Sequence, residues 1–409
     1  MNTDLHQLRG VEVADVYVGD VLAAQLRRTS AGTSFRYLDD YLAGGGPPVA
    51  TTLPLAATEV LTPAGALPPF FAGLLPEGRR LLAVRAAVKT SADDELTLLL
   101  AVGGDAVGHA RVVPAGASPA PDEPGPPEVD ASEQVSFREL FRAAVGSDAA
   151  LLDRVALPGV QDKISGRMIA FPVAGSRRQF LLKLNPPEFP HLVENEAFFL
   201  EAARRSGLPV ANAELVRDRD GEVGLLVERF DRLPVADRLV RVAQEDACQV
   251  LGRYPADKYL VTTEEVVRAL ASVTDAPVVA ARDLLRQVAF AYLTGNGDAH
   301  AKNFSVLRLS SGEWRVSPAY DLPSSHPYGD TTMALSIDGR IREDVTWRSF
   351  VAAADAVGVP ERAVRRMLAD LTERVDRWLP DLDSLPFDER RRHRLARLVA
   401  DRRTKLTPT

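Results

Sequence analysis

The stretch "AYLTGNGDAHAKNFSVL", residues 291–307, decides the fold, because it sets a dense polar cluster directly after a segment that resembles a buried helix. That segment has apolar residues at helical spacing, which predict one core-facing stripe of Leu284, Leu285, Val288, Ala289, Tyr292 and Leu293. Gly295 and Gly297 predict an abrupt end to the helix. Asp298 is therefore expected at the mouth of a rigid element.

Asp298 and Asn303 have the Asp-x-x-x-x-Asn spacing of a protein-kinase catalytic loop. In such a loop the Asp accepts the proton of the substrate hydroxyl and the Asn holds a magnesium ion. The alternative is that both residues cap a helix-to-strand turn, which is common for Asp and Asn after a glycine.

The following stretch "FSVLRLSSGEWRVSPAYDL", residues 304–322, has two apolar runs around Ser-Ser-Gly-Glu and predicts a hairpin centred near Ser311. Such a hairpin sets Asn303 opposite Tyr320, and Asp321 then arrives at a cross-strand distance of about 5 Å between Cβ atoms. Mg²⁺ prefers oxygen ligands. The sequence thus predicts Asn303 and Asp321 as Mg²⁺ ligands, with Asp298 as the base or aligner of the nucleophile.

A second group of residues fits the phosphates of ATP. Lys183 lies on the predicted strand "FLLKLN", before a predicted helix over 191–207 that carries Glu194 and Glu196. A strand lysine paired with a helix glutamate positions ATP in kinases, although a single strand lysine is more often solvated. The turn "LPGVQDKISG", residues 157–166, could fold over the phosphates. It has too few glycines for a standard phosphate loop, so an ordinary hairpin turn is the alternative.

Composition limits the function classes. A chain of 409 residues with 46% hydrophobic and 26% charged residues predicts a soluble protein of two or three packed units. Because Cys248 is the only cysteine, an internal disulfide, a zinc cage and a Cys-X-X-Cys pair are excluded. The sequence has neither a signal-peptide pattern nor an apolar run long enough to span a bilayer, and we expect a cytoplasmic protein. A net charge of -7 argues against a nucleic-acid binder held by phosphate neutralisation.

The order of patterns predicts an α+β chain. Residues 1–113 are read as a β-rich N-terminal domain, and residues 114–131 as a Pro/Ala-rich linker. Residues 132–241 combine a hairpin, further strands and a helix, which predicts a small ATP-binding lobe. Residues 242–409 are mostly helical in pattern and form the predicted catalytic lobe.

Several long stretches between residues 70 and 325 resemble the HipA family of serine/threonine kinases, the toxins of bacterial toxin–antitoxin pairs. They are "FFAGLLPEG", "LLAVGGDAVG", "LPGVQDKIS", "FLLKLN", "ENEAFFLEAARRSGLPVANAEL", "LLVERFDR", "QEDACQVLGRYPADKY", "GNGDAHAKNFSVL" and "SPAYDLPSS". The resemblance implies a two-lobed protein-kinase-like fold with an added N-terminal β-rich domain and a large helical C-terminal lobe.

The resemblance also implies roles for individual residues. Asp298 matches the catalytic aspartate, and Asn303 and Asp321 match the Mg²⁺ ligands. Lys183 matches the phosphate-binding lysine, with Glu196 as its preferred partner and Glu194 as the alternative. The remaining ATP-binding positions are the loop residues Pro158, Gly159, Val160, Gln161, Asp162 and Lys163, the hinge residues Glu228, Arg229 and Phe230, and His300, Lys302 and Tyr320 around the catalytic loop.

One position departs from the family. The regulatory autophosphorylated serine lies three positions before the loop glycine, and Ala156 stands there in this chain. The resemblance implies a cytosolic protein substrate, such as an aminoacyl-tRNA synthetase or another translation factor. It also implies a small helix-turn-helix antitoxin as partner, contact with DNA only through that complex, and no membrane.

Two other functions stay open at this point. Phosphoinositide kinases use a related Gly-Asp-x-His-x-x-Asn loop, which "GDAHAKN" also satisfies, so a lipid or small-molecule kinase is the first alternative. The second is a non-catalytic co-repressor subunit. The basic run "DERRRHRLARLVADRRTKL", residues 388–406, could face DNA in such a complex. We favour the solvated face of an amphipathic helix, with Leu395, Leu398 and Val399 on its apolar side.

Overall fold

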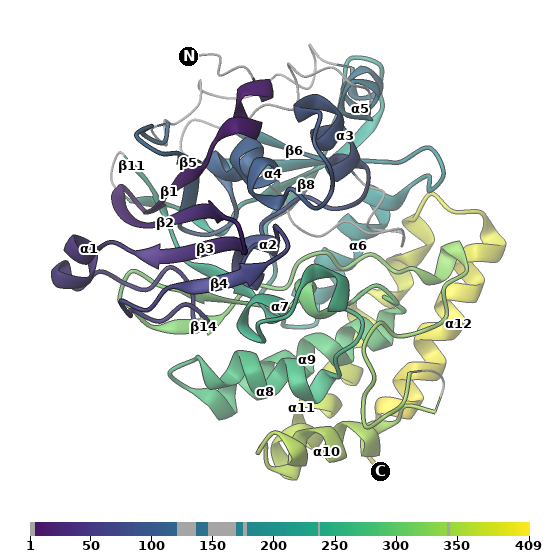
Figure 1. Cartoon of the computed structure of the whole chain (residues 1–409). Helices are drawn as coiled ribbons and strands as arrows, with labels where there is room; N and C mark the ends of the chain where they lie inside the picture. The colour runs from purple at the N-terminus through teal and green to yellow at the C-terminus, as the bar shows by residue number, and fades with distance from the viewer. Residues whose placement is uncertain (1–4, 121–135, 146–168, 175–177, 236–237, 342–343) are drawn as a thin grey trace.

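A computed structural model of the chain describes residues 5–120, 136–145, 169–174, 178–235, 238–341 and 344–409. Figure 1 shows the N-terminal strands gathered on one side of the molecule and the long helix α12 on the opposite side. Of the predicted linker 114–131, residues 121–131 lie outside the described residues. In the part of the chain that is described, no helix is long and apolar enough to cross a bilayer.

The N-terminal region is built on an antiparallel five-stranded sheet of order β4-β3-β2-β1-β5. The alternating pattern before and after the Gly19–Asp20 turn produces its first hairpin, and Gly19 adopts the left-handed backbone (φ 59°) that such a turn needs. The first four strands form a meander. The strands of the sheet are β1 Val13–Val18, β2 Val21–Thr29, β3 Gly32–Tyr37, β4 Val60–Pro63 and β5 Ala110–Pro114. The helices are α1 Asp39–Gly44, α2 Pro69–Ala72, α3 Gly78–Val88 and α4 Glu95–Val102.

The small lobe holds an antiparallel four-stranded sheet of order β6-β7-β9-β8. One face of the sheet packs against the helix α5 through Phe137, and the other face packs against α6. The elements are α5 Phe137–Val145, β6 Ile169–Ala174, β7 Gln179–Leu184, α6 Leu192–Arg205, β8 Ala213–Arg217 and β9 Val223–Glu228. The strands β10 Arg232–Val235 and β11 Arg238–Arg241 form a separate two-stranded sheet.

The C-terminal lobe is mainly helical, as predicted, and surrounds the helix α9. Its helices are α7 Ala247–Val250, α8 Thr263–Ser272, α9 Pro277–Thr294, α10 Trp347–Ala356, α11 Glu361–Glu373 and α12 Glu389–Leu406. Its strands are β12 Gln244–Asp246, β13 Ser305–Arg308 and β14 Trp314–Val316. The sequence pattern did not identify β12, because a strand of three residues is too short to show a period.

Helix α9 is the axis of this lobe, and Figure 1 shows it among α8, α10, α11 and α12. Pro277 starts it at the first helical position, and Gly295 ends it in the left-handed conformation with φ 73°. A Cβ atom at Gly295 would also lie 2.6 Å from the Leu398 side chain, so both the backbone conformation and the available space favour glycine at this helix end. The predicted stripe Leu284, Leu285, Val288, Ala289, Tyr292 and Leu293 is buried.

The N-terminal region and the C-terminal lobe each have a hydrophobic core. Polar contacts join them, and one connects Thr51 to Glu245 on β12. The Thr51 N–H donates to Glu245 Oε1 at 2.8 Å, and its hydroxyl donates to Oε2 at 2.7 Å. Burial, with Asp246 beside it, raises the pKa of Glu245 to about 7 against the hydrogen bonds from Thr51.

Glu245 therefore predicts a pH dependence of stability. Below pH 4.5, the ordinary pKa of a glutamate in the unfolded chain, Glu245 is protonated in both the folded and the unfolded state. Between pH 4.5 and about pH 7 only the folded protein keeps the proton. The free energy of unfolding therefore falls as the pH rises through this range. Glu245→Gln removes this loss. We expect the variant to gain up to about 3 kcal/mol relative to the wild type between pH 4.5 and pH 8. Urea denaturation across this range measures the difference. The exposed Glu201→Gln control should show none, and a pH-independent difference for Glu245→Gln would contradict the prediction.

Candidate active site

Asp298 lies just after the end of α9, in a turn held by buried hydrogen bonds. The Gly297 N–H donates to Ser325 Oγ at 2.7 Å, and the Asp298 N–H donates to Asn296 Oδ1 at 3.1 Å. The Tyr259 hydroxyl donates to Asp298 Oδ1 at 2.7 Å. Burial and the Asp298 charge raise the pKa of Tyr259, so Tyr259 stays a hydrogen-bond donor. The position of the Asp298 carboxylate is therefore fixed by its surroundings.

The chain returns to this turn through the hairpin of β13 and β14. Its register pairs Arg308 with Trp314, which confirms the predicted centre at Ser311. Beyond the strands, Asn303 Nδ2 donates to Asp321 Oδ2 at 2.6 Å. Asp321 itself has a left-handed backbone with φ 56°, a conformation in which Asp and Asn are enriched among non-glycine residues.

Lys183 on β7 joins the small lobe to Asp321. Its Nζ lies 2.7 and 2.9 Å from the two carboxylate oxygens of Glu196 on α6, and 3.1 Å from Asp321 Oδ1. Burial opposes the charge of Lys183, but Asp321 and Glu196 outweigh it and raise its pKa; Lys183 in turn holds the pKa of Asp321 below its ordinary value against burial. Glu194, the alternative partner, instead accepts from Asn185 Nδ2 at 2.9 Å.

The other residues of the catalytic loop face different ways. Lys302 pairs with Glu77 of the N-terminal region, at 2.8 Å. His300 packs edge-to-face against Tyr259, with 5.2 Å between the ring centroids. Burial, with Lys258 beside it, lowers the pKa of His300 to about 3, so its imidazole is neutral at physiological pH. The Tyr320 hydroxyl donates to the Lys302 carbonyl at 2.7 Å.

The three predicted hinge residues, Glu228, Arg229 and Phe230, make different kinds of contact. The Glu228 N–H donates to the Asn212 carbonyl at 2.8 Å, so this donor is engaged within the protein. The Phe230 ring lies against the Tyr320 ring, with 5.6 Å between centroids, and is close to the catalytic loop.

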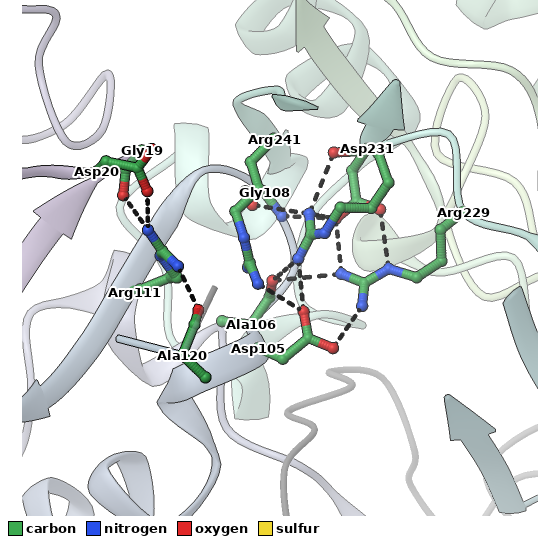
Figure 2. Close-up of polar contacts among 11 residues, drawn as sticks. Gly19, Asp20, Asp105, Ala106, Gly108, Arg111, Ala120, Arg229, Asp231 and Arg241 are labelled. Carbon is green, nitrogen blue, oxygen red and sulfur yellow. Dashed lines mark hydrogen bonds and ion pairs between the residues drawn. The ribbon is translucent and has the colours of Figure 1, made fainter. Parts of the chain in front are cut away.

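The Arg229 side chain leaves the hinge and enters a buried charge cluster, which Figure 2 shows. Arg229 contacts Asp105 of the N-terminal region at 3.0 Å and Asp231 at 2.9 Å. Arg232 and Arg241 reach the same Asp105 at 2.8 and 3.1 Å. Burial favours the neutral acid, but Arg229 and Arg232 outweigh it and lower the pKa of Asp231. The Arg229 side chain thus joins the N-terminal region to the small lobe.

The predicted phosphate loop, Pro158 to Lys163, and Ala156 lie outside the described residues. Conversely, sequence reasoning gave no role to Tyr259, Asn296 or Glu77. All three stand in stretches that resemble the family: Asn296 in "GNGDAHAKNFSVL", Tyr259 in "QEDACQVLGRYPADKY" and Glu77 in "FFAGLLPEG". For Tyr259 and Glu77, no spacing rule connects the residue to a catalytic loop so far away in the chain.

A strand lysine paired with a helix glutamate, an aspartate after a helix and an adjoining Asn–Asp pair together define the class of protein, a kinase. The family of HipA-like C-terminal domains matches residues 155–379, and the family of HipA N-terminal domains matches residues 14–113. The chain belongs to the HipA family, and it is an ATP-dependent phosphotransferase.

Individual proteins agree with this assignment. Y4mE of Sinorhizobium fredii, which carries the name of a kinase, is 34% identical over 82% of this chain and 84% of its own length. The serine/threonine-protein kinase toxin HipA of Shewanella oneidensis is 27% identical over 92% of this chain and 90% of its own. A solved complex of Shewanella oneidensis HipA with HipB and operator DNA contains a similar chain, with a TM-score of 0.74 at 24% identity over 96% of both chains. This similarity confirms the predicted fold.

Proposed function

We propose that the chain transfers the γ-phosphoryl group of ATP to a serine or threonine hydroxyl of a protein. The observation that carries the proposal is the convergence on Asp321, whose carboxylate accepts from Lys183 on one oxygen and from Asn303 on the other. Phosphoryl transfer needs charge neutralisation and alignment more than covalent chemistry. Lys183 would contact the phosphates, and Asp298 would accept the proton of the attacking hydroxyl.

Asp321 and Asn303 are the proposed Mg²⁺ ligands, and their donor atoms fit that ion. Mg²⁺ takes oxygen ligands, and one or two protein side chains with phosphates and water complete its shell. Asn303 Oδ1 accepts from the His300 N–H at 3.1 Å, and the second lone pair of this oxygen would be the one offered to an ion. When bound, Mg²⁺ would neutralise the charge on the phosphates.

The partners follow from the relatives. The structure from Shewanella oneidensis contains HipB and operator DNA, and this supports an antitoxin as partner of the present chain. We propose that this antitoxin is a small helix-turn-helix protein and that the chain reaches DNA only through it. The name of the Shewanella oneidensis relative supports a serine/threonine substrate and a growth-arresting role. We place the protein in the cytoplasm, with a translation factor such as an aminoacyl-tRNA synthetase as substrate.

Asp298→Asn tests the proposal. Removing the base should lower transfer of labelled γ-phosphate from ATP to bacterial lysate proteins by on the order of 10² or more. The exposed Asp355→Asn on α10 is the control and should label like the wild type. Equal labelling by the Asp298→Asn variant would refute the role of Asp298, and labelling of lipid without protein would refute the protein substrate.

A further inference from the structure

Glu77 lies between two buried lysines beside the catalytic loop. Its Oε2 is 2.6 Å from Lys258 Nζ and its Oε1 is 2.8 Å from Lys302 Nζ. The side chains of Lys258 and Lys302 are 0% and 2% exposed, so neither ammonium has water to replace the carboxylate. Burial alone would raise the pKa of Glu77, but Lys302 and Lys258 outweigh it and lower the pKa to about 2. The carboxylate is therefore charged at physiological pH.

Glu77 belongs to the N-terminal region, not to either lobe of the kinase. It follows α2 and immediately precedes α3, and α2 packs against α7 of the C-terminal lobe (Figure 1). Gln249 on α7 donates to the Phe70 carbonyl at 3.0 Å, and Lys302 Nζ donates to the Gly73 carbonyl at 3.1 Å. The segment just before Glu77 is thus attached to the C-terminal lobe by two further hydrogen bonds.

From Lys258 the contacts continue to the catalytic aspartate. The Lys258 carbonyl accepts from the Ala301 N–H at 3.2 Å, inside the catalytic loop. The next residue, Tyr259, donates its hydroxyl to Asp298 Oδ1 at 2.7 Å. The anchor of Lys258 therefore also sets the place from which Tyr259 reaches Asp298.

We propose that Glu77 is a positioning residue for Asp298, acting through Lys258 and Tyr259, so that the N-terminal region completes the active site of the kinase. This inference rests on the proposed function, since it takes Asp298 as the group that accepts the hydroxyl proton. Misplacing a reacting group by about 1 Å can cost on the order of 10²-fold in rate. A loosened Tyr259 should cost less, because Asp298 keeps its backbone contacts.

The test measures steady-state phosphoryl transfer to a protein substrate from the lysate at saturating Mg²⁺. Glu77→Gln and Tyr259→Phe should each lower kcat about tenfold, and the KM for ATP should stay within about threefold because Lys183 is unchanged. In the double variant kcat should stay within about threefold of the slower single variant, since both changes break one chain of contacts.

Two further variants keep the test informative. Lys258→Met leaves Glu77 paired with Lys302 alone, so the charges stay balanced, and this variant can replace Glu77→Gln if the latter does not fold. It should also lower kcat about tenfold. Combined with Tyr259→Phe, it should lower kcat no further than the slower single variant. Glu188→Gln is the matched control. Glu188 pairs with Arg79 on α3 at 2.5 Å and so joins the N-terminal region to the small lobe instead of the C-terminal lobe. Its variant should keep the wild-type kcat.

The outcomes below apply when the wild-type protein is active and Asp298→Asn is not. The inference is wrong if folded Glu77→Gln or Lys258→Met keeps the wild-type kcat, or if the losses of kcat in the double variants multiply. It is also wrong if Glu188→Gln loses as much kcat as Glu77→Gln does. Absence of transfer by the wild type, or full transfer by Asp298→Asn, would instead reject the proposed function.

Discussion

Asp321→Asn is expected to lower phosphoryl transfer by on the order of 10³, the largest loss from a single carboxylate in this protein. The Asp321 carboxylate accepts from both the Lys183 ammonium and the Asn303 amide. Asn keeps the size of the side chain and tolerates the left-handed backbone at φ 56°, so the loss reports the missing charge. The Mg²⁺ concentration for half-maximal rate should rise together with the loss of rate.

Asp338→Asn is a matched control for this variant. Asp338 also has a left-handed backbone, with φ 50°, and also pairs with a cation, Arg340, but it is an exposed turn residue. Its variant should transfer phosphate at the wild-type rate. Activity of Asp321→Asn near the wild-type level, or a normal Mg²⁺ dependence, would contradict the assignment of Asp321 as a metal ligand.

Lys183→Met should lower transfer by about 10²–10³ and raise the KM for ATP. Met has a similar length but no charge, so the phosphates lose their cation. Glu196 and Asp321 also lose a counter-charge while 1% and 14% exposed, and the variant should therefore melt at a lower temperature.

A second substitution separates stability from activity. Lys183→Met with Glu196→Gln removes one of the two unpaired carboxylates, and we expect it to recover melting temperature but no activity. Lys405→Met is the control, because Lys405 pairs with Asp401 at 2.7 Å on the outer helix α12. If the double variant regained transfer, Lys183 would be a structural residue and its role toward ATP would be wrong.

Two pairs in the site, Asn303 with Asp321 and Lys183 with Glu196, could be predicted from the sequence, but on different grounds. The predicted hairpin brings Asn303 and Asp321 to the same end of the two strands, and their contact lies just beyond the paired residues. The pairing of Lys183 with Glu196 rather than Glu194 needed the family pattern, because one helix offers both carboxylates and helical spacing alone does not choose between them.

The contacts between the N-terminal region and the kinase lobes could not be predicted in this way. Glu77 stands 181 residues from Lys258, and Thr51 stands 194 residues from Glu245. Such pairs are set by how two separate cores pack, and no period or spacing encodes them. The ion pair of Arg229 with Asp105 could not be predicted for the same reason. From the sequence, an arginine directly after a strand is equally consistent with a hinge residue or a solvated side chain.

The charge cluster of Figure 2 also restricts how this protein can be recombined with its relatives. The N-terminal region supplies the carboxylate of Asp105 and the carbonyls of Ala106 and Gly108. Asp105 meets Arg229, Arg232 and Arg241 from the other part of the chain. In a chimera whose first domain comes from a relative without an acid at this place, Arg229, Arg232 and Arg241 would each lose an ion pair, and Arg229 and Arg232 would keep the one with Asp231. An exchange of domains between relatives therefore has to transfer Asp105 together with the arginines that pair with it.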